Sequence, residues 1–270
     1  MGKMLSPTRY PVVLIHGIGY SDESYPQYWG SIPEALRQNG TTVYFGGQDS
    51  YAKVTDNAAK LKTRILELLE SEDCEKVNLI AHSKGGIEAR YMITCLDMAD
   101  RVASLTTIAT PHRGIGAIDI WKEKAPGILR QLYGLFALMV RVDGGDRPKD
   151  LSVFDQMSED YMGVFNELVP DKAGVYYQSW ACDMVSKETD PVMGAFFELI
   201  RRSHGMCDGL VPVESAMWGN FRGVYRGPDG LGISHPMACG GRAKWMEKKG
   251  RTDLSLWYID MVRELGRMGF

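Results

Sequence analysis

The sequence has no excess of positive charge, no clustered cysteine and histidine spacing of the kind that binds zinc, and no long hydrophobic run. Its 31 lysine and arginine residues are outnumbered by 34 aspartate and glutamate residues, which gives a formal net charge of −3. Nucleic-acid-binding proteins usually present a basic face, so the charge does not favour that class of function. A membrane-spanning helix needs roughly 20 apolar residues in a row, and no segment approaches that length.

Cysteine is scarce, and its spacing does not indicate a disulfide framework. The 5 cysteines are an odd number and are widely separated: Cys74, Cys95, Cys182, Cys207 and Cys239. Ile87, Tyr91 and Cys95 recur every four residues, which predicts a buried free thiol at Cys95 on the inner face of a helix. The chain runs from Met1 almost directly into a predicted strand at Pro11, which leaves no room for a signal segment and predicts a cytoplasmic location.

The segment from Val77 to Ile87 organises the rest of the chain. It reads as a short apolar strand, a tight turn with two glycines, and the first turn of a helix. Ala81, Ser83 and Gly85 fit the pattern A-x-S-x-G, a variant of the G-x-S-x-G turn that holds a nucleophilic serine in a strained conformation above a sheet. Small residues flank such a serine because strand and helix approach closely there. The pattern predicts Ser83 as a nucleophile.

Strands and helices alternate through the first part of the chain. The run 12–15 predicts a buried strand, and it ends in the His-Gly-x-Gly sequence of residues 16–19, where the active sites of open α/β folds gather. Such alternation predicts a parallel sheet with helices on both faces. Further strands are expected at 41–45, 77–80, 102–109, 175–180 and 221–225. Helices are expected to begin after Ser31, after a cap at Asp56, and after a cap at Thr252 or Asp253, and another is expected over 158–168.

The alternation disappears between residues 114 and 170. An apolar helical face there is formed by Ile128, Leu129, Leu132, Leu135, Phe136, Met139 and Val140. Two interpretations stay open: a cap over an active site, or an ordinary pair of core-packing helices. The predicted organisation is a core of residues 1–113 and 171–270 with a helical lid inserted at 114–170. Such a lid could rest transiently on lipid or mediate a dimer, so monomer and dimer both stay open.

A serine hydroxyl needs a base within hydrogen-bond reach and a third group that orients the base. Behind a nucleophile turn of this kind, the partners follow in the order serine, aspartate, histidine. Asp208 lies in a turn, and His235 follows the last predicted strand. His204 is the only serious rival for the base, but it precedes Asp208. The predicted catalytic residues are therefore Ser83, Asp208 and His235.

Backbone N–H groups are expected to bind the oxyanion of the tetrahedral intermediate. One is that of Lys84, at a helix N-terminus where the dipole favours negative charge, and the other is that of Ile18. The Lys84 side chain has two interpretations: a pair with Glu88 four residues later, or an ammonium group near the pocket that favours acidic substrates.

The loops at the same edge of the predicted sheet supply the candidate substrate-binding residues. His16 and Gly17 end the first strand, and His16 is expected to order its loop. Tyr20 belongs to an aromatic loop that continues to Trp29. His112 follows an early strand and could line the pocket.

The sequence resembles the bacterial family I lipases of the α/β-hydrolase fold, most closely their leaderless Gram-positive relatives. The resemblance lies in residues 10–17, 77–91, 102–114 and 208–213, and the segment 102–114 is the most specific. It implies carboxylic-ester hydrolysis by a Ser83–His235–Asp208 triad and a mobile lid. Ala81 and Lys84 replace the usual glycine and glutamine. Secreted members bind calcium through an aspartate two residues after the catalytic histidine; Met237 stands there, so no metal is expected at that site.

The sequence thus predicts a serine carboxylesterase or lipase that works through an acyl-enzyme and needs no cofactor. Its expected partner is a small-molecule or lipid ester, with no nucleic acid and no membrane span. Two alternatives stay open: a thioesterase or acyltransferase that shares the triad, and a catalytically silent ligand-binding protein built on the same fold.

Overall fold

A parallel sheet forms the centre of the computed structural model, which describes residues 7–116, 118–119, 127, 134, 145–146, 152–251 and 254–270. Within these residues the strands pair in the order β2-β1-β3-β4-β5-β6, and every neighbouring pair is parallel. The parallel sheet predicted from the alternation is confirmed. The strands are β1 (Val12–Ile15), β2 (Val43–Phe45), β3 (Val77–His82), β4 (Val102–Ile108), β5 (Tyr176–Cys182) and β6 (Asn220–Tyr225).

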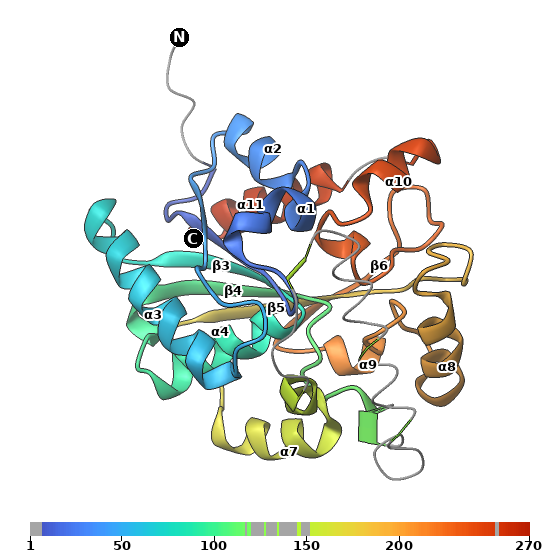
Figure 1. The fold of residues 1–270 in the computed structure, drawn as a ribbon. Coiled ribbons are helices and arrows are strands. Elements are labelled where there is room, and N and C mark those ends of the chain that lie inside the picture. Colours follow the sequence, from blue (N-terminus) through green and yellow to red (C-terminus); the bar gives the residue numbers. More distant parts are fainter. Residues whose placement is uncertain are drawn as a thin grey trace.

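Helices cover both faces of the sheet (Figure 1). On one face α3 (Val54–Ser71) packs beside α4 (Lys84–Cys95), and on the other α2 (Ile32–Gln38) packs beside α11 (Ser255–Arg267). The remaining described helices are α1 (Tyr25–Trp29), α7 (Glu159–Leu168), α8 (Gly194–His204), α9 (Val213–Ala216) and α10 (Ala243–Lys248), with short 3₁₀ turns at Asp22–Ser24, Ala99–Arg101, Ser152–Met157 and Met237–Cys239.

The strand β1 shows why the sheet needs cover on both sides. Val12 and Leu14 point into the core on the α11 face, whereas Val13 and Ile15 point into the core shared with α3 and α4. All of these side chains are fully buried. Because successive residues of a strand face opposite ways, an uninterrupted apolar run has to be enclosed by two layers.

Most predicted elements are present, with shifted ends. β2 begins at Val43 and not at Thr41, and α3 begins at Val54 with Lys53 as its N-cap, so the prediction that Asp56 caps this helix is wrong. Ser158 caps α7 by accepting the N–H of Tyr161. The predicted cap of the last helix, Thr252 or Asp253, lies outside the described residues.

The prediction of a buried thiol at Cys95 is wrong, because this residue is exposed and Tyr91 is only half-buried. The four-residue spacing assumed a helix with one buried stripe. Instead α4 is enclosed on nearly all sides over its first two turns, where even Lys84 and Arg90 are buried. Only its last turn reaches the surface, and that turn carries Cys95.

The described end of the predicted insertion packs on the core. Asn166 of α7 accepts a hydrogen bond from Arg90 of α4 at 2.8 Å, and the rings of Phe165 and Tyr91 lie 6.4 Å apart. The apolar residues 128, 129, 132, 135, 136, 139 and 140, on which the lid prediction rests, lie outside the described residues. Among the helices that the structure describes, none combines the length and the apolar character needed to cross a bilayer.

Helix α11 closes the sheet with an aromatic cluster that offers a test of the packing. The Trp257 ring stacks on Tyr225 of β6 at 3.9 Å and meets Trp180 of β5 edge-on at 5.6 Å. We expect Trp257→Ala to lower the free energy of unfolding by about 3–5 kcal/mol, because it leaves a large cavity. Urea unfolding followed by circular dichroism measures the change.

The neighbouring residue is the matched control for this substitution. Leu256 is 64% exposed, so Leu256→Ala is expected to change the free energy of unfolding by no more than about 0.5 kcal/mol. Equal losses in the two variants would contradict the assigned packing of α11.

Candidate active site

Ser83 lies at the sharp turn between β3 and α4. Its backbone has φ +56° and ψ −134°, outside the regions that a residue with a side chain normally occupies. Such a conformation costs about 1–3 kcal/mol and persists only when the surroundings hold it. Here the Ser83 N–H donates to the Ile108 carbonyl at 3.0 Å, and the Thr110 hydroxyl donates to the Ser83 carbonyl at 2.8 Å.

Two glycines allow the first strand to approach this turn. A Cβ atom on Gly17 would lie 2.7 Å from Cβ of Ser83, and one on Gly85 would overlap the His16 carbonyl oxygen. Any larger residue would push the β1 loop away from the serine. The predicted requirement for small residues around Ser83 therefore has a direct steric cause.

The structure brings the predicted catalytic side chains together. His235 Nε2 lies 2.9 Å from Ser83 Oγ across 152 residues of sequence, and His235 Nδ1 lies 2.7 Å from Asp208 Oδ2. The N–H groups of Leu210 and Val211 donate to the other carboxylate oxygen, Oδ1, at 2.9 and 2.7 Å. With Nδ1–H donated to the carboxylate, Nε2 is free to accept the proton of the serine hydroxyl.

His82 packs on the other side of His235, with ring centroids 4.6 Å apart. The Tyr28 hydroxyl accepts the Gly17 N–H at 2.6 Å and lies 2.5 Å from His82 Nδ1. Burial lowers the pKa of His82 well below its usual value, with a smaller contribution from His235. His82 is thus a neutral ring that supports His235 and does not compete with it as a base.

The loop after β1 is held on both sides of Ile18. Gly17 donates to Tyr28, and Gly19 donates to the Ser50 carbonyl at 2.8 Å. Tyr28 lies in the aromatic loop that sequence analysis describes between Tyr20 and Trp29. No local pattern marks it, because its partners come from the loop after β1 and from the end of β3.

The sequence profile of the family described as "Palmitoyl protein thioesterase" matches residues 11–172. The chain is 31% identical over 265 residues to triacylglycerol lipase 2 of Saccharomyces cerevisiae, covering 90% of this chain and 74% of the yeast protein. The family match and the yeast relative together show that the chain belongs to the lipase-like α/β-hydrolases. It is also 29% identical over 247 residues to the triacylglycerol lipase of Vibrio cholerae, with 81% of this chain and 78% of that protein covered.

Solved structures share the fold of this lipase-like hydrolase. The mature lipase BlEst2 of Bacillus licheniformis matches with a TM-score of 0.68 at 17% identity, covering 92% of this chain and 94% of that one. The Staphylococcus hyicus lipase matches with a TM-score of 0.67 at 15% identity, covering 99% and 98% of the two chains. The predicted resemblance to bacterial lipases is confirmed.

The Lys84 side chain of the hydrolase is buried in an ion pair with Glu88. Its ammonium group also donates to the Ala52 carbonyl at 2.8 Å. Glu88 in turn accepts from Asn57 at 2.8 Å and from Gln48 at 3.2 Å, and Gln48 donates to the His16 carbonyl at 3.0 Å. The ammonium charge is matched within the protein, which favours the structural interpretation of Lys84.

The predicted substrate-binding residues separate into two groups. His16 and Tyr20 flank the loop that faces Ser83, and the His16 ring nitrogens lie 2.7 Å from the Gly17 carbonyl and 3.3 Å from the Gln48 carbonyl. His112 is fully buried elsewhere. Its ring is 2.9 Å from Thr107 Oγ1, 3.3 Å from an Arg90 nitrogen, and stacked on Trp218, so the structure gives it a packing role.

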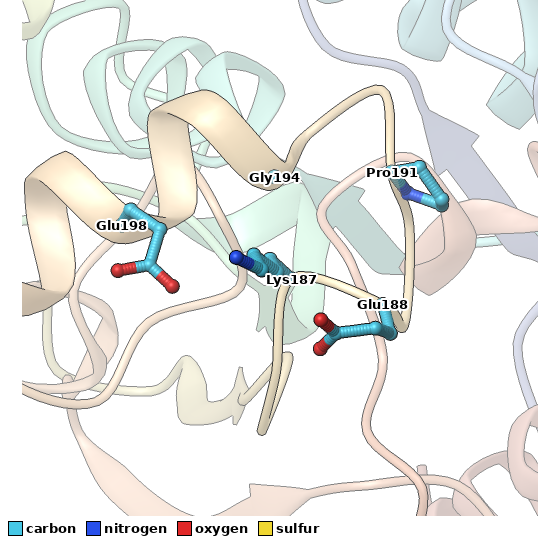
Figure 2. A pocket seen from close by; sticks show the side chains of 5 residues that line it. All are labelled: Lys187, Glu188, Pro191, Gly194 and Glu198. Atoms are coloured by element: carbon cyan, nitrogen blue, oxygen red, sulfur yellow. The ribbon is translucent and has the colours of Figure 1, made fainter.

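The hollows of the described surface include the following two. One of about 740 Å³ is beside the β1 loop, lined by Ser21, Asp22, Glu23, Asp146 and residues 47–52. The other, of about 370 Å³, lies beside the loop that leads into α8 and is lined by Lys187, Glu188, Pro191, Gly194 and Glu198 (Figure 2). Ser83 and His235 line neither of them. His204, the rejected base, lies 3.7 Å from Glu159.

The Lys84–Glu88 pair makes the enzyme sensitive to loss of one charge. We expect Glu88→Gln to lower the free energy of unfolding by about 3 kcal/mol, because it leaves a buried ammonium group unmatched. Urea unfolding measures the loss. Glu67→Gln is the control: this carboxylate is 3.8 Å from Arg64 and its side chain is 63% exposed, so a change below about 0.5 kcal/mol is expected. Similar values for both variants would argue against a buried pair.

Burial makes the stability of the hydrolase depend on pH through His82 and His112. The pKa values of both are lowered well below the usual 6.5, chiefly by burial and, for His112, also by Arg90. Between the native pKa and 6.5 the unfolded chain binds more protons, so stability is lost as pH falls below about 6.5, by up to about 1.4 kcal/mol per pH unit for each histidine. His112→Gln should flatten this slope in unfolding curves at pH 5–7; an unchanged slope would contradict the effect.

Proposed function

We propose that the protein is a serine carboxylic-ester hydrolase in which Ser83, His235 and Asp208 form the catalytic triad. The proposal rests above all on the strained turn that presents Ser83 to the imidazole of His235 at 2.9 Å. It is supported by the 2.7 Å distance between His235 Nδ1 and Asp208 Oδ2, and by the two backbone N–H groups that donate to Asp208 Oδ1. In this arrangement Ser83 is the nucleophile, His235 is the base, and Asp208 orients His235.

The proposed reaction begins with proton transfer. His235 Nε2 takes the Ser83 proton as Oγ attacks the ester carbonyl, and Asp208 stabilises the imidazolium that forms. The same nitrogen returns the proton to the leaving alcohol, which leaves an acyl-enzyme on Ser83. Water then attacks the acyl group with His235 again as base, releasing the carboxylic acid and restoring the serine.

The oxyanion is proposed to bind the backbone N–H groups of Ile18 and Lys84. Lys84 is the first residue of the twelve-residue helix α4, where the helix dipole favours negative charge. Ile18 lies between two residues whose own N–H groups are bonded to Tyr28 and Ser50. A loop held on both sides is a preorganised donor, which is what stabilisation of an oxyanion requires.

The proposed substrates are lipid esters of the triacylglycerol type. The relatives from Saccharomyces cerevisiae and Vibrio cholerae are both named triacylglycerol lipases. Thioester hydrolysis is the second candidate, because the matched family profile is described as that of a palmitoyl protein thioesterase. The triad serves either reaction, since both pass through the same acyl-enzyme and differ in the leaving group.

The lid over residues 114–170 stays part of the proposal. Its support is the apolar helical pattern of the sequence, and the described residues 152–168 would form its attachment to α4. A lid of this kind would shield acyl chains from water when the site is loaded.

The function is tested by labelling and kinetics. A fluorophosphonate probe should label the wild type and fail to label Ser83→Ala, and His235→Ala or Ser83→Ala should lower kcat on p-nitrophenyl esters by at least about 10⁴-fold. A series of acyl chain lengths, each presented as a glycerol ester and as an acyl-CoA thioester, separates the two substrate classes. Wild-type activity in Ser83→Ala would refute the assignment of the nucleophile. A wild type that shows neither labelling nor activity would favour a silent binding protein.

A further inference from the structure

Asp190 is a buried carboxylate that the proposed mechanism does not use. It lies in the loop between β5 and α8 and is 2% exposed. Its Oδ1 lies 3.0 and 3.4 Å from the N–H nitrogens of Val192 and Met193, and its Oδ2 accepts from Ser234 Oγ at 2.9 Å and from Arg242 Nε at 3.3 Å. Four donors therefore converge on one carboxylate.

The bond to Ser234 connects this carboxylate to the proposed base. Ser234 is fully buried and immediately precedes His235 in the chain. On the other side, the His235 N–H donates to the Asp208 carbonyl at 2.8 Å. The Asp190 side chain thus holds the residue that precedes His235, and the Asp208 backbone holds the N–H group of His235 itself.

Arg242 supplies the countercharge, and it does so from an uncommon backbone conformation. Its φ is +64° and its ψ +12°, a left-handed conformation that favours glycine. Residues 240 and 241 are glycines, but the next residue, in the left-handed conformation, is an arginine. The arginine side chain is only 11% exposed where it meets Asp190. Because a buried carboxylate without a countercharge is costly, the guanidinium group offsets the strain of its own backbone.

The residues around His235 do not fit the calcium ion that secreted members of the resembled lipase family bind. Calcium binds six to eight oxygen ligands, but Met237 offers a buried thioether at the position of the expected aspartate. The oxygens of Asp190 already accept four hydrogen bonds. In the described part of the chain, no three histidine, cysteine, aspartate or glutamate side chains are grouped to hold a metal ion.

We propose that Asp190 and Arg242 are positioning residues for His235, and that the Arg242 guanidinium is an internal cation that fixes the His235 loop without a metal. This inference rests on the proposed function, because it assigns a purpose to the placement of His235. A displacement of about 1 Å in a catalytic group can cost about 10²-fold in rate. Loss of the pair should therefore lower kcat and leave KM nearly unchanged.

Substitutions of Arg242 test the pair by kinetics on a p-nitrophenyl ester. Arg242→Gln is expected to lower kcat about 10- to 100-fold with KM within about twofold, and Asp190→Asn to act in the same direction. Arg242→Lys keeps the cation and should recover most of the lost kcat. The matched control is Arg222→Gln, which breaks an ion pair with Glu264 between β6 and α11 and should keep wild-type kcat. Wild-type kcat in both Arg242→Gln and Asp190→Asn would overturn the proposal.

Dialysis against EDTA tests whether a metal ion holds the loop that carries His235. Wild-type enzyme dialysed against EDTA should keep its kcat and its Tm, and added calcium should raise neither. Loss of activity in EDTA with recovery in calcium would overturn the proposal.

A milder variant covers the case in which Arg242→Gln does not fold. Ser234→Ala removes one hydroxyl group and should lower kcat about threefold to tenfold at unchanged KM, since Arg242 still holds Asp190. Unchanged kcat in this variant would overturn the link to His235. Fluorophosphonate labelling of Ser83 distinguishes failure of the proposed function from failure of the positioning role. An unlabelled wild type refutes the hydrolase function. A labelled wild type with fully active Arg242 variants refutes only the positioning role.

Discussion

The proposed active site requires the contact between Ser83 Oγ and His235 Nε2. It joins the end of β3 to a loop 152 residues later, and it is short enough for proton transfer only if both sides are fixed to within about half an ångström. Ser83 is fixed by the strained turn and by the bonds from Ser83 to Ile108 and from Thr110 to Ser83. His235 needs equivalent restraints from a part of the chain that has no regular secondary structure.

Two buried ion pairs supply restraint on the two sides of this contact. Lys84 and Glu88 bind the segment 48–57, and through Gln48 they reach the loop that carries Ile18. Asp190 and Arg242 bind the loop that carries His235. A buried ion pair seldom adds net stability, but removing one partner is expensive. Such pairs are therefore well suited to holding one loop geometry against its alternatives.

Several features of the site could be predicted because they depend on local or ordered signals. The A-x-S-x-G turn predicted Ser83 as a nucleophile, and the order of partners favoured His235 over His204. The structure places His235 beside Ser83 and His204 beside Glu159. The prediction that Asp56 caps α3 was wrong because this helix begins at Val54. The prediction for Cys95 was wrong because it assumed an isolated amphipathic helix. In the fold, α4 is enclosed by the sheet and by neighbouring helices, so burial follows depth in the molecule and not the four-residue period.

Local patterns were enough to predict the alternating elements, the parallel sheet and the strained turn at Ser83, because apolar periodicity and glycine spacing act over a few residues. Only the tertiary structure decided which polar residues meet: Tyr28 with His82, Lys84 with Glu88 and Gln48, and Asp190 with Ser234 and Arg242. Such pairings join segments that are far apart in the chain. Their geometry is fixed by how whole layers pack, and no local pattern records it.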